Sequence, residues 1–218
     1  MSKSPAVTPR WALARALGFT TLGVLLSPHR AATQMPDDGP RTTFLFARYA
    51  TRTSRALYTG YGNESWQGIL ALIENPRTGY HEALMGVAKR ITLAQRQSTI
   101  IALALSDASD SRYGEIYVVP SLAIAPLALT GSAEIAVPLG AQGTLQYYIN
   151  PLSVHVPVDS RLRVGATYIL AGQVGTMTGE ALGPSVRAVV PHGAFTFDWV
   201  LGLRAYHTET RLSFQTSL

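Results

Sequence analysis

The chain has 218 residues, of which 47% are hydrophobic and 14% are charged. This composition excludes an intrinsically disordered chain, and the length suits one domain with a short extension. The net charge of +5 comes almost entirely from scattered arginines, which does not indicate a nucleic-acid-binding protein, and the absence of cysteine excludes disulfides and thiolate metal sites.

The N-terminus has the layout of an export signal. Three basic residues precede an apolar run over 16–26, and small residues follow at 31–33. This order predicts a secretory signal peptide over 1–33, and residues 34–41 are then a short periplasmic linker. A short amphipathic or anchoring helix that stays attached is the alternative. No later segment has the ~18 uncharged apolar residues of a helical membrane span, so any membrane crossing must use strands.

From residue 42 to residue 218 the pattern favours strands, and no long stretch has a helical period with caps. We expect about twelve strands, with ten as the alternative. Their expected ranges are 42–53, 55–62, 66–74, 80–93, 97–106, 113–125, 127–139, 143–158, 161–174, 181–190, 193–206 and 208–218. Five prolines fall in or near these ranges, where a missing N–H breaks a ladder bond unless a bulge or a strand end accommodates it: Pro120, Pro138, Pro151, Pro157 and Pro184.

Most of these segments alternate between an apolar face and a face of glycines, hydroxyls and single charges. Many run past ten residues, which is the length that a tilted strand needs to cross a bilayer and is long for a soluble protein. The pattern therefore predicts an all-β, closed, antiparallel up-and-down transmembrane barrel whose apolar face contacts lipid. The side chains expected to face lipid are Phe195, Phe197, Trp199, Leu201, Leu203, Leu212, Phe214 and Leu218.

The opposite faces carry charges of both signs, which we expect to line the lumen. These residues are Glu82, Arg90, Glu115, Glu134, Arg163, Arg187, Asp198, Arg204 and Arg211. Isolated charges in a narrow barrel are costly to desolvate, so they should pair or stay hydrated. Two interpretations remain open: a salt-bridged, nearly closed structural barrel, or a narrow polar pore whose arginines favour anionic solutes.

The links between strands fall into two sets if both termini lie on the periplasmic side. The turns at 63–65, 94–96, 159–160 and 191–192 are then tight, and more polar links lie on the outer side. Aromatic residues at strand ends suit an interfacial girdle, although such residues are also simply common in strands. The residues concerned are Tyr80, Tyr113 and Tyr206 at the outer ends and Trp66 at an inner end.

The last strand, "TRLSFQTSL", alternates apolar residues up to the carboxyl terminus. It resembles the C-terminal strand of bacterial outer-membrane barrels, which most often end in phenylalanine where this chain ends in leucine. The region from residue 42 onward resembles the small outer-membrane β-barrel class of porin-like proteins. That resemblance implies export to the outer membrane of a Gram-negative bacterium, insertion by the barrel assembly machinery, and lipopolysaccharide and phospholipid neighbours. It also implies a passive function, as a channel for small polar solutes or a structural barrel, without cofactor or metal.

Two other functional classes stay open. A lipid-modifying barrel enzyme would use Ser153 and His155, which share a face, with Asp159 or Glu134 orienting the histidine. The glycine-flanked nucleophile turn of hydrolases is absent, so we expect no enzyme. A secreted soluble barrel that binds a lipophilic ligand would instead bury the Phe195–Trp199 face and expose Asp198 and Arg204.

Overall fold

The computed structural model describes residues 42–217, which form twelve strands. Their bounds are β1 (Thr42–Ala50), β2 (Arg55–Gly62), β3 (Trp66–Asn75), β4 (Tyr80–Ala94), β5 (Gln97–Ala108), β6 (Arg112–Ile124), β7 (Leu127–Pro138), β8 (Gln146–Pro157), β9 (Leu162–Gln173), β10 (Gly179–Val190), β11 (Gly193–Arg204) and β12 (Glu209–Ser217). The expected signal peptide over 1–33, the linker over 34–41 and Leu218 lie outside the described residues. Within 42–217, no helix has the length and apolar character to cross a membrane.

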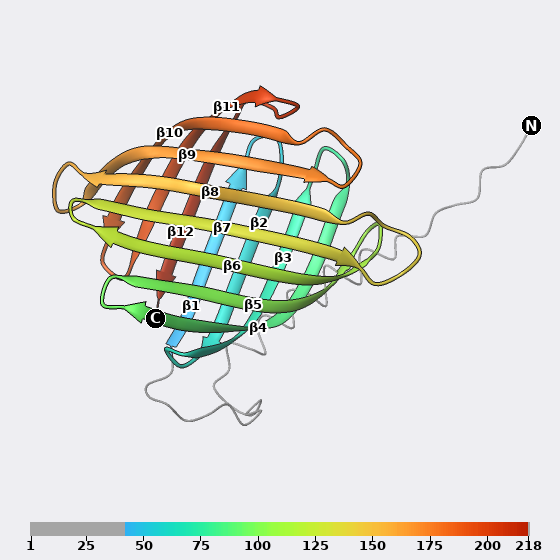
Figure 1. The fold of residues 1–218 in the computed structure, drawn as a ribbon, viewed down its shortest axis with the longest axis horizontal. Coiled ribbons are helices and arrows are strands. Elements are labelled where there is room, and N and C mark those ends of the chain that lie inside the picture. Colours follow the sequence, from blue (N-terminus) through green and yellow to red (C-terminus); the bar gives the residue numbers. More distant parts are fainter. Residues whose placement is uncertain (1–41, 218) are drawn as a thin grey trace, which may run out of the picture. The chain divides into compact units, whose positions relative to one another are not determined.

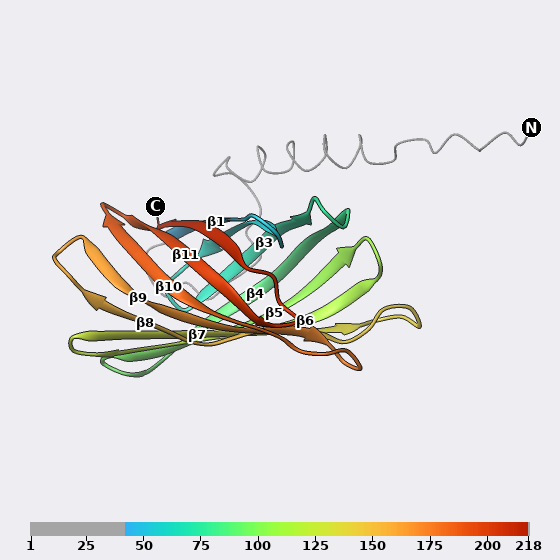
Figure 2. The same cartoon turned by 90° about the horizontal axis from the view of Figure 1, so that it is seen from above.

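Each strand pairs antiparallel with its neighbours in sequence, and β1 pairs with β12 to close the barrel. In Figure 1 the strands on the near side run across those on the far side, as the tilt of a closed sheet requires. Figure 2 shows β7 and β8 on the wall opposite β1 and β3. The predicted closed, antiparallel all-β barrel is confirmed, with twelve strands and not ten.

The two ends of the barrel differ in their connections. An even number of antiparallel strands brings Thr42 and Ser217 to the same end, which we call the terminus end. Its connections are short: 63–65, 95–96, 125–126, 158–161 and 191–192. The opposite end, called the loop end, has on the whole longer ones: 51–54, 76–79, 109–111, 139–145 and 174–178, followed by 205–208. The residue sets agree with the predicted division into tight turns and longer loops.

Alternation along the strands turns large apolar side chains outward. On β11, Phe195 is 43% exposed, Trp199 52% and Leu203 61%, whereas Ala194 and Val200, at positions of the opposite face, are buried. The same order holds on β12, where Leu212 is exposed and Arg211 is buried. A soluble barrel would bury the large apolar face instead, so the described structure has the opposite arrangement to a soluble ligand-binding barrel.

Three of the five prolines lie at a strand end or beside a register shift, and two lie inside strands. Pro138 and Pro157 are the last residues of β7 and β8. Pro151 lies where the register between β8 and β9 shifts, between Ile149 and Leu152. Pro120 and Pro184 remain inside β6 and β10, opposite Thr99 and Ala166.

The pairing of β8 with β9 requires glycine at position 165. A Cβ built on Gly165 would meet the carbonyl oxygen of Val154 and the Cα of His155 on the neighbouring strand. Gly165→Ala should therefore push these strands apart and destabilise the barrel by about 1–3 kcal/mol, as overpacking typically does. Urea unfolding of the refolded barrel measures this loss. The control is Gly140→Ala in the 139–145 loop, where a Cβ meets nothing within 4 Å, and equal stability of both variants would contradict the close approach.

Candidate functional site

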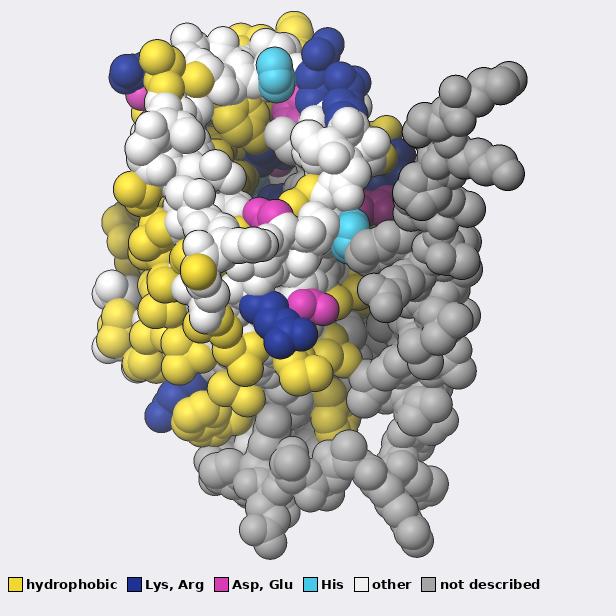
Figure 3. All heavy atoms as spheres, turned by 90° about the vertical axis from the view of Figure 1, so that its right-hand side faces the viewer, with side chains coloured by type: hydrophobic (Ala, Val, Ile, Leu, Met, Phe, Trp, Pro, Cys, Tyr) yellow, Lys and Arg dark blue, Asp and Glu magenta, His cyan; other side chains and the backbone are white. Residues whose placement is uncertain are grey.

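The barrel interior is the candidate site, because it holds the charged residues that the described strands turn inward. By alternation and burial, the inward-facing charges predicted from the sequence include Glu82, Glu115, Asp198 and Arg211. By alternation, four more predicted residues lie at inward positions on β4, β7, β9 and β10, although Arg90 is exposed: Arg90, Glu134, Arg163 and Arg187. Figure 3 views the right-hand side of Figure 1 and shows a hollow with basic and acidic side chains inside it.

Arg204, the ninth predicted lumen residue, lies at the end of β11 and its side chain is 60% exposed. Its guanidinium forms an ion pair of 3.6 Å with Glu180, at a point where the register between β10 and β11 shifts. The hydroxyl of Tyr168 also donates to Glu180, at 3.5 Å. Arg204 therefore belongs to the rim of the loop end and is remote from the middle of the lumen.

The lumen is divided lengthwise. One side is filled by an apolar cluster from β3, β4 and β5, against which Phe44, Tyr58 and Ile100 pack. Its buried members are Ile69, Ala71, Leu84, Ala88, Ala102 and Ala104. The other side contains a cavity of about 200 Å³ whose lining comes entirely from β1 and β7–β12. The apolar cluster and this cavity therefore occupy different sides of the lumen.

The cavity lining is rich in hydroxyl groups and arginine. Three arginines and one aspartate supply its formal charges: Arg48, Arg187, Arg211 and Asp198. Thr130, Ser132, Asn150, Ser153, Thr167, Thr196 and Ser213 supply neutral polar groups, and Phe46, Tyr148 and His155 complete the lining. Such a surface can hydrogen-bond a polar solute and attracts negative charge.

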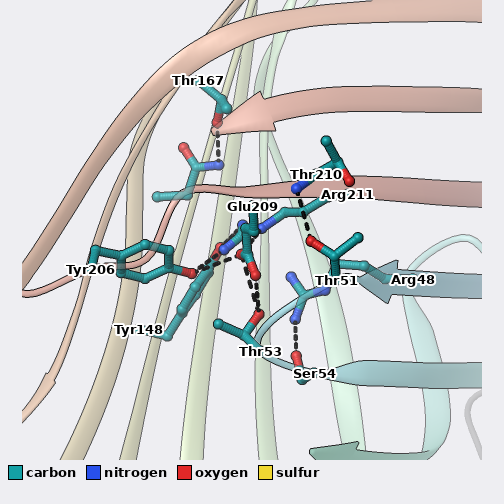
Figure 4. Close-up of polar contacts among 11 residues, drawn as sticks. Arg48, Thr51, Thr53, Ser54, Tyr148, Thr167, Tyr206, Glu209, Thr210 and Arg211 are labelled. Atoms are coloured by element: carbon teal, nitrogen blue, oxygen red, sulfur yellow. Dashed lines mark hydrogen bonds and ion pairs between the residues drawn. The ribbon is translucent and has the colours of Figure 1, made fainter. Parts of the chain in front are cut away.

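A buried ion pair with aromatic partners lies at the start of β12, and its Arg211 lines this cavity (Figure 4). Arg211 Nε donates to Glu209 Oε1 at 2.7 Å, and both side chains are almost fully buried. Arg211 also donates to the hydroxyls of Tyr148, at 2.6 Å, and Tyr206. The hydroxyls of Tyr206 and Thr53 donate to Glu209, which gives the carboxylate a nearly complete set of partners. This satisfied network is rigid and fixes where Arg211 lies.

Sequence reasoning missed Glu209 and Arg48. Glu209 shares a strand face with Arg211, two residues away, so the alternation of β12 could have identified it. Arg48 lies on β1, faces inward and has its guanidinium carbon 5.6 Å from the centre of the Tyr148 ring. Arg48 Nη2 also donates to Ser54 Oγ at 3.4 Å. The strand pattern of β1 is weak, because Phe44, Phe46 and Leu45 make both faces apolar.

Arg163 and Arg187 are direct partners across β9 and β10. Like charges at such positions repel each other, and neither guanidinium forms an ion pair with a carboxylate among the described residues. Together with Arg48 and Arg211 they make the β9–β1 side of the lumen basic.

Three lumen carboxylates lie on the other side, whereas Asp198 and Glu209 lie on the β9–β1 side. Glu82, Glu115 and Glu134 project from β4, β6 and β7, with the hydroxyl of Tyr80 donating to Glu82 at 3.0 Å and that of Tyr117 donating to Glu115. Among residues 42–217, no group of three or more His, Asp or Glu side chains is arranged to hold a metal ion.

The hydroxyl and imidazole considered for hydrolysis do not bond to each other. Ser153 Oγ lies 2.9 Å from Thr167 Oγ1, whereas His155 Nε2 lies 2.9 Å from Ser185 Oγ, across Gly165. Asp159 lies in the 158–161 turn, where the N–H groups of Arg161 and Leu162 donate to it and lower the pKa of its carboxyl. The hydrogen bond between Ser153 and His155 that a hydrolase nucleophile would need is therefore not formed.

The interfacial girdle predicted for three tyrosines is also wrong. Tyr113 is 1% exposed and donates to Asp110, Tyr80 donates to Glu82, and Tyr206 belongs to the Arg211 network. Each hydroxyl lies on the lumen side because an inward polar partner is within reach there. The outward aromatic side chains are others, such as Tyr49 and Tyr61.

Removing Glu209 should destabilise the barrel strongly. Glu209→Ala leaves Arg211 buried without its carboxylate, which costs about 3–5 kcal/mol for a buried pair. The control is Glu74→Ala, which breaks an exposed pair with Arg55 at 3.3 Å and should cost about 0–1 kcal/mol. Urea unfolding in detergent micelles compares the two variants. Similar midpoints for both would show that the Arg211 network contributes no more than a surface pair.

The comparisons with known proteins concern the fold. No family model matches the sequence, and the search of curated proteins found no match. Among solved structures, the chain is similar to the KdgM porin, with a TM-score of 0.56 and 9% identity over 81% of this chain and 99% of that one. The NanC porin gives a TM-score of 0.55 and 11% identity over 81% of this chain and 98% of that one. The expected resemblance to porin-like barrels is thus confirmed at the level of the fold.

Proposed function

We propose that this chain is a porin-like channel of the outer membrane that passes small polar solutes and prefers anions. The observation that carries the proposal is the combination of an exposed apolar wall with a hollow, arginine-rich interior in a closed barrel. An apolar outer wall suits hydrocarbon, and a polar interior suits water and solute. The porin fold of the KdgM and NanC structures supports the same assignment.

The outer wall supports membrane insertion. Seven side chains on β11 and β12 would contact lipid: Phe195, Phe197, Trp199, Leu201, Leu203, Leu212 and Phe214. With the terminus end in the periplasm, the longer connections face outward, as in outer-membrane barrels. Export, assembly by the barrel machinery, and contact with phospholipid and lipopolysaccharide are parts of this proposal.

The cavity lining supports a preference for anions. Arg48 and Arg187 face the cavity without a carboxylate partner among the described residues, and Asp198 is the single acid in the lining. One solved structure of similar fold, also with a TM-score of 0.56, is the KdgM porin in complex with disordered oligogalacturonate. Oligogalacturonate is an anionic saccharide, so a barrel of similar fold forms a complex with an anion, which supports the preference that we propose.

A closed structural barrel is the second candidate, favoured by one observation. The apolar cluster of β3–β5, with Phe44, Tyr58 and Ile100, fills its side of the lumen. The cavity along β7–β12 then has to be continuous for solutes to pass. No catalytic step is part of either candidate.

Ion selectivity distinguishes the candidates. In a planar bilayer under a salt gradient, the refolded barrel should give conductance steps with a reversal potential on the anion side. Arg187→Glu should weaken or invert that preference, because it reverses one of three positive charges in the lining. The new carboxylate would lie beside Arg163, which protects folding.

The matched control is Arg96→Glu, an exposed position in the 95–96 turn, which should leave the selectivity unchanged. A silent bilayer with folded protein would favour the structural barrel. A cation-selective wild type would contradict the anion preference.

The outer wall gives an independent test. Phe197→Arg places a charge near the middle of β11 on the outward face and should cost about 2–4 kcal/mol of folding free energy in a bilayer. Phe197→Leu keeps the apolar character and should fold as the wild type does. Folding into phospholipid vesicles, followed by the shift between boiled and unboiled samples on a gel, measures the difference. Equal folding of the two variants would argue against a lipid-facing β11.

A further inference from the structure

Lys89 interrupts the apolar outer wall. It is the only lysine among the described residues, the chain's other one being Lys3. Lys89 is exposed on β4, between the outward-facing Val87 and Ile91, and its cross-strand partner on β5 is Ile101. A charge in this position needs either a carboxylate or a polar part of the surrounding membrane.

In contrast to Lys89, the outward arginines Arg55 and Arg112, and Arg204 at the rim of the loop end, have carboxylate partners. Arg55 pairs with Glu74 at 3.3 Å, Arg112 with Asp107 at 3.2 Å and Arg204 with Glu180 at 3.6 Å. All three pairs lie toward the loop end. Lys89 lies toward the terminus end and forms no ion pair with a described carboxylate, including that of the exposed Glu64 in the adjacent turn.

The ring of Trp66 lies beneath the ammonium group. Lys89 Nζ is 4.8 Å from the centre of the ring, and the two residues are direct partners across β3 and β4. A cation over an indole face is favourable and keeps the long lysine side chain near one position. Trp66 is the first residue of β3, so the pair lies at the level where the 63–65 turn leaves the sheet.

The turn before Trp66 holds it in place. Asn63 is 4% exposed, and its Oδ1 accepts the backbone N–H groups of Ser65, at 2.9 Å, and Trp66, at 2.7 Å. The N–H of Asn63 donates to the carbonyl of Trp66 at 2.9 Å. The backbone that carries the indole is therefore held by the buried side chain of Asn63.

We propose that Lys89 and Trp66 form a binding site for the phosphate of an anionic phospholipid. The ammonium would pair with the phosphate, the indole would lie at the headgroup level, and Val87 and Ile101 would contact the acyl chains. Because the site is at the terminus end, the lipid belongs to the periplasmic leaflet. The inference rests on the membrane location of the proposed function and is independent of channel activity.

Native mass spectrometry of the full chain released from membranes of equal phosphatidylglycerol and phosphatidylcholine content tests the site. Wild-type protein should retain phosphatidylglycerol over phosphatidylcholine by about fivefold, the effect of one cation near an anionic headgroup. Lys89→Met, which keeps the apolar stem, should bring the ratio close to one. Lys89→Arg should preserve the preference, and Trp66→Leu should reduce it.

Arg55→Met is the matched control, since that outward cation is already paired with Glu74 and should leave the ratio unchanged. An unchanged ratio in Lys89→Met, with the gel shift of a folded barrel intact, would overturn this site alone. A chain that inserts into no membrane would overturn the site and the proposed function together. An equal loss in Arg55→Met would overturn the site in favour of a general charge effect.

Discussion

Closure of the sheet between β1 and β12 gives every strand two hydrogen-bonded neighbours, and the other features of the structure depend on it. A sheet with a free edge would leave backbone N–H and C=O groups without partners, which hydrocarbon cannot supply. Once closed, the sheet has one inside and one outside. Because side chains alternate along each strand, one set points into the lumen and the other points to the outer wall. Trp199 is exposed and Val200 beside it is buried for this reason alone.

The interior then has to accommodate side chains from twelve strands in a narrow space. Small residues such as Ala102 and Ala104 allow the β3–β5 side to pack closely, and the larger polar groups gather on the opposite side. The charged side chains in the lumen differ in whether they have a partner of opposite charge. Arg211 and Glu209 satisfy each other with help from tyrosine hydroxyls, whereas Arg163 and Arg187 stay together without acidic partners. The first pair contributes to stability, and the second leaves two inward guanidinium groups without a carboxylate partner among the described residues.

The sequence was sufficient for the strands and for the direction of their faces, because both follow from local alternation. The expected segment 193–206 corresponds to Gly193–Arg204, and 161–174 to Leu162–Gln173. It was insufficient for contacts between strands. His155 bonds to Ser185 and not to Ser153, since register and the missing side chain at Gly165 decide which polar groups meet. Alternation places Tyr113 on the inward face with Glu115, which the girdle prediction overlooked. Tyr206 lies in the 205–208 connection, where alternation gives no direction and its contacts with Glu209 and Arg211 decide it.

The lengthwise division of the lumen has a consequence for how such a barrel can change. The strands that line the cavity are consecutive from β7 to β12 and continue into β1, whereas the apolar filling comes from β3 to β5. Substitutions that change the charge of the cavity lining therefore fall on β1 and β7–β12 and leave the apolar packing of β3–β5 unchanged. Arg211 is the exception, because it lines the cavity and also forms the buried ion pair with Glu209, so a change at this position alters the lining and the stability of the barrel together.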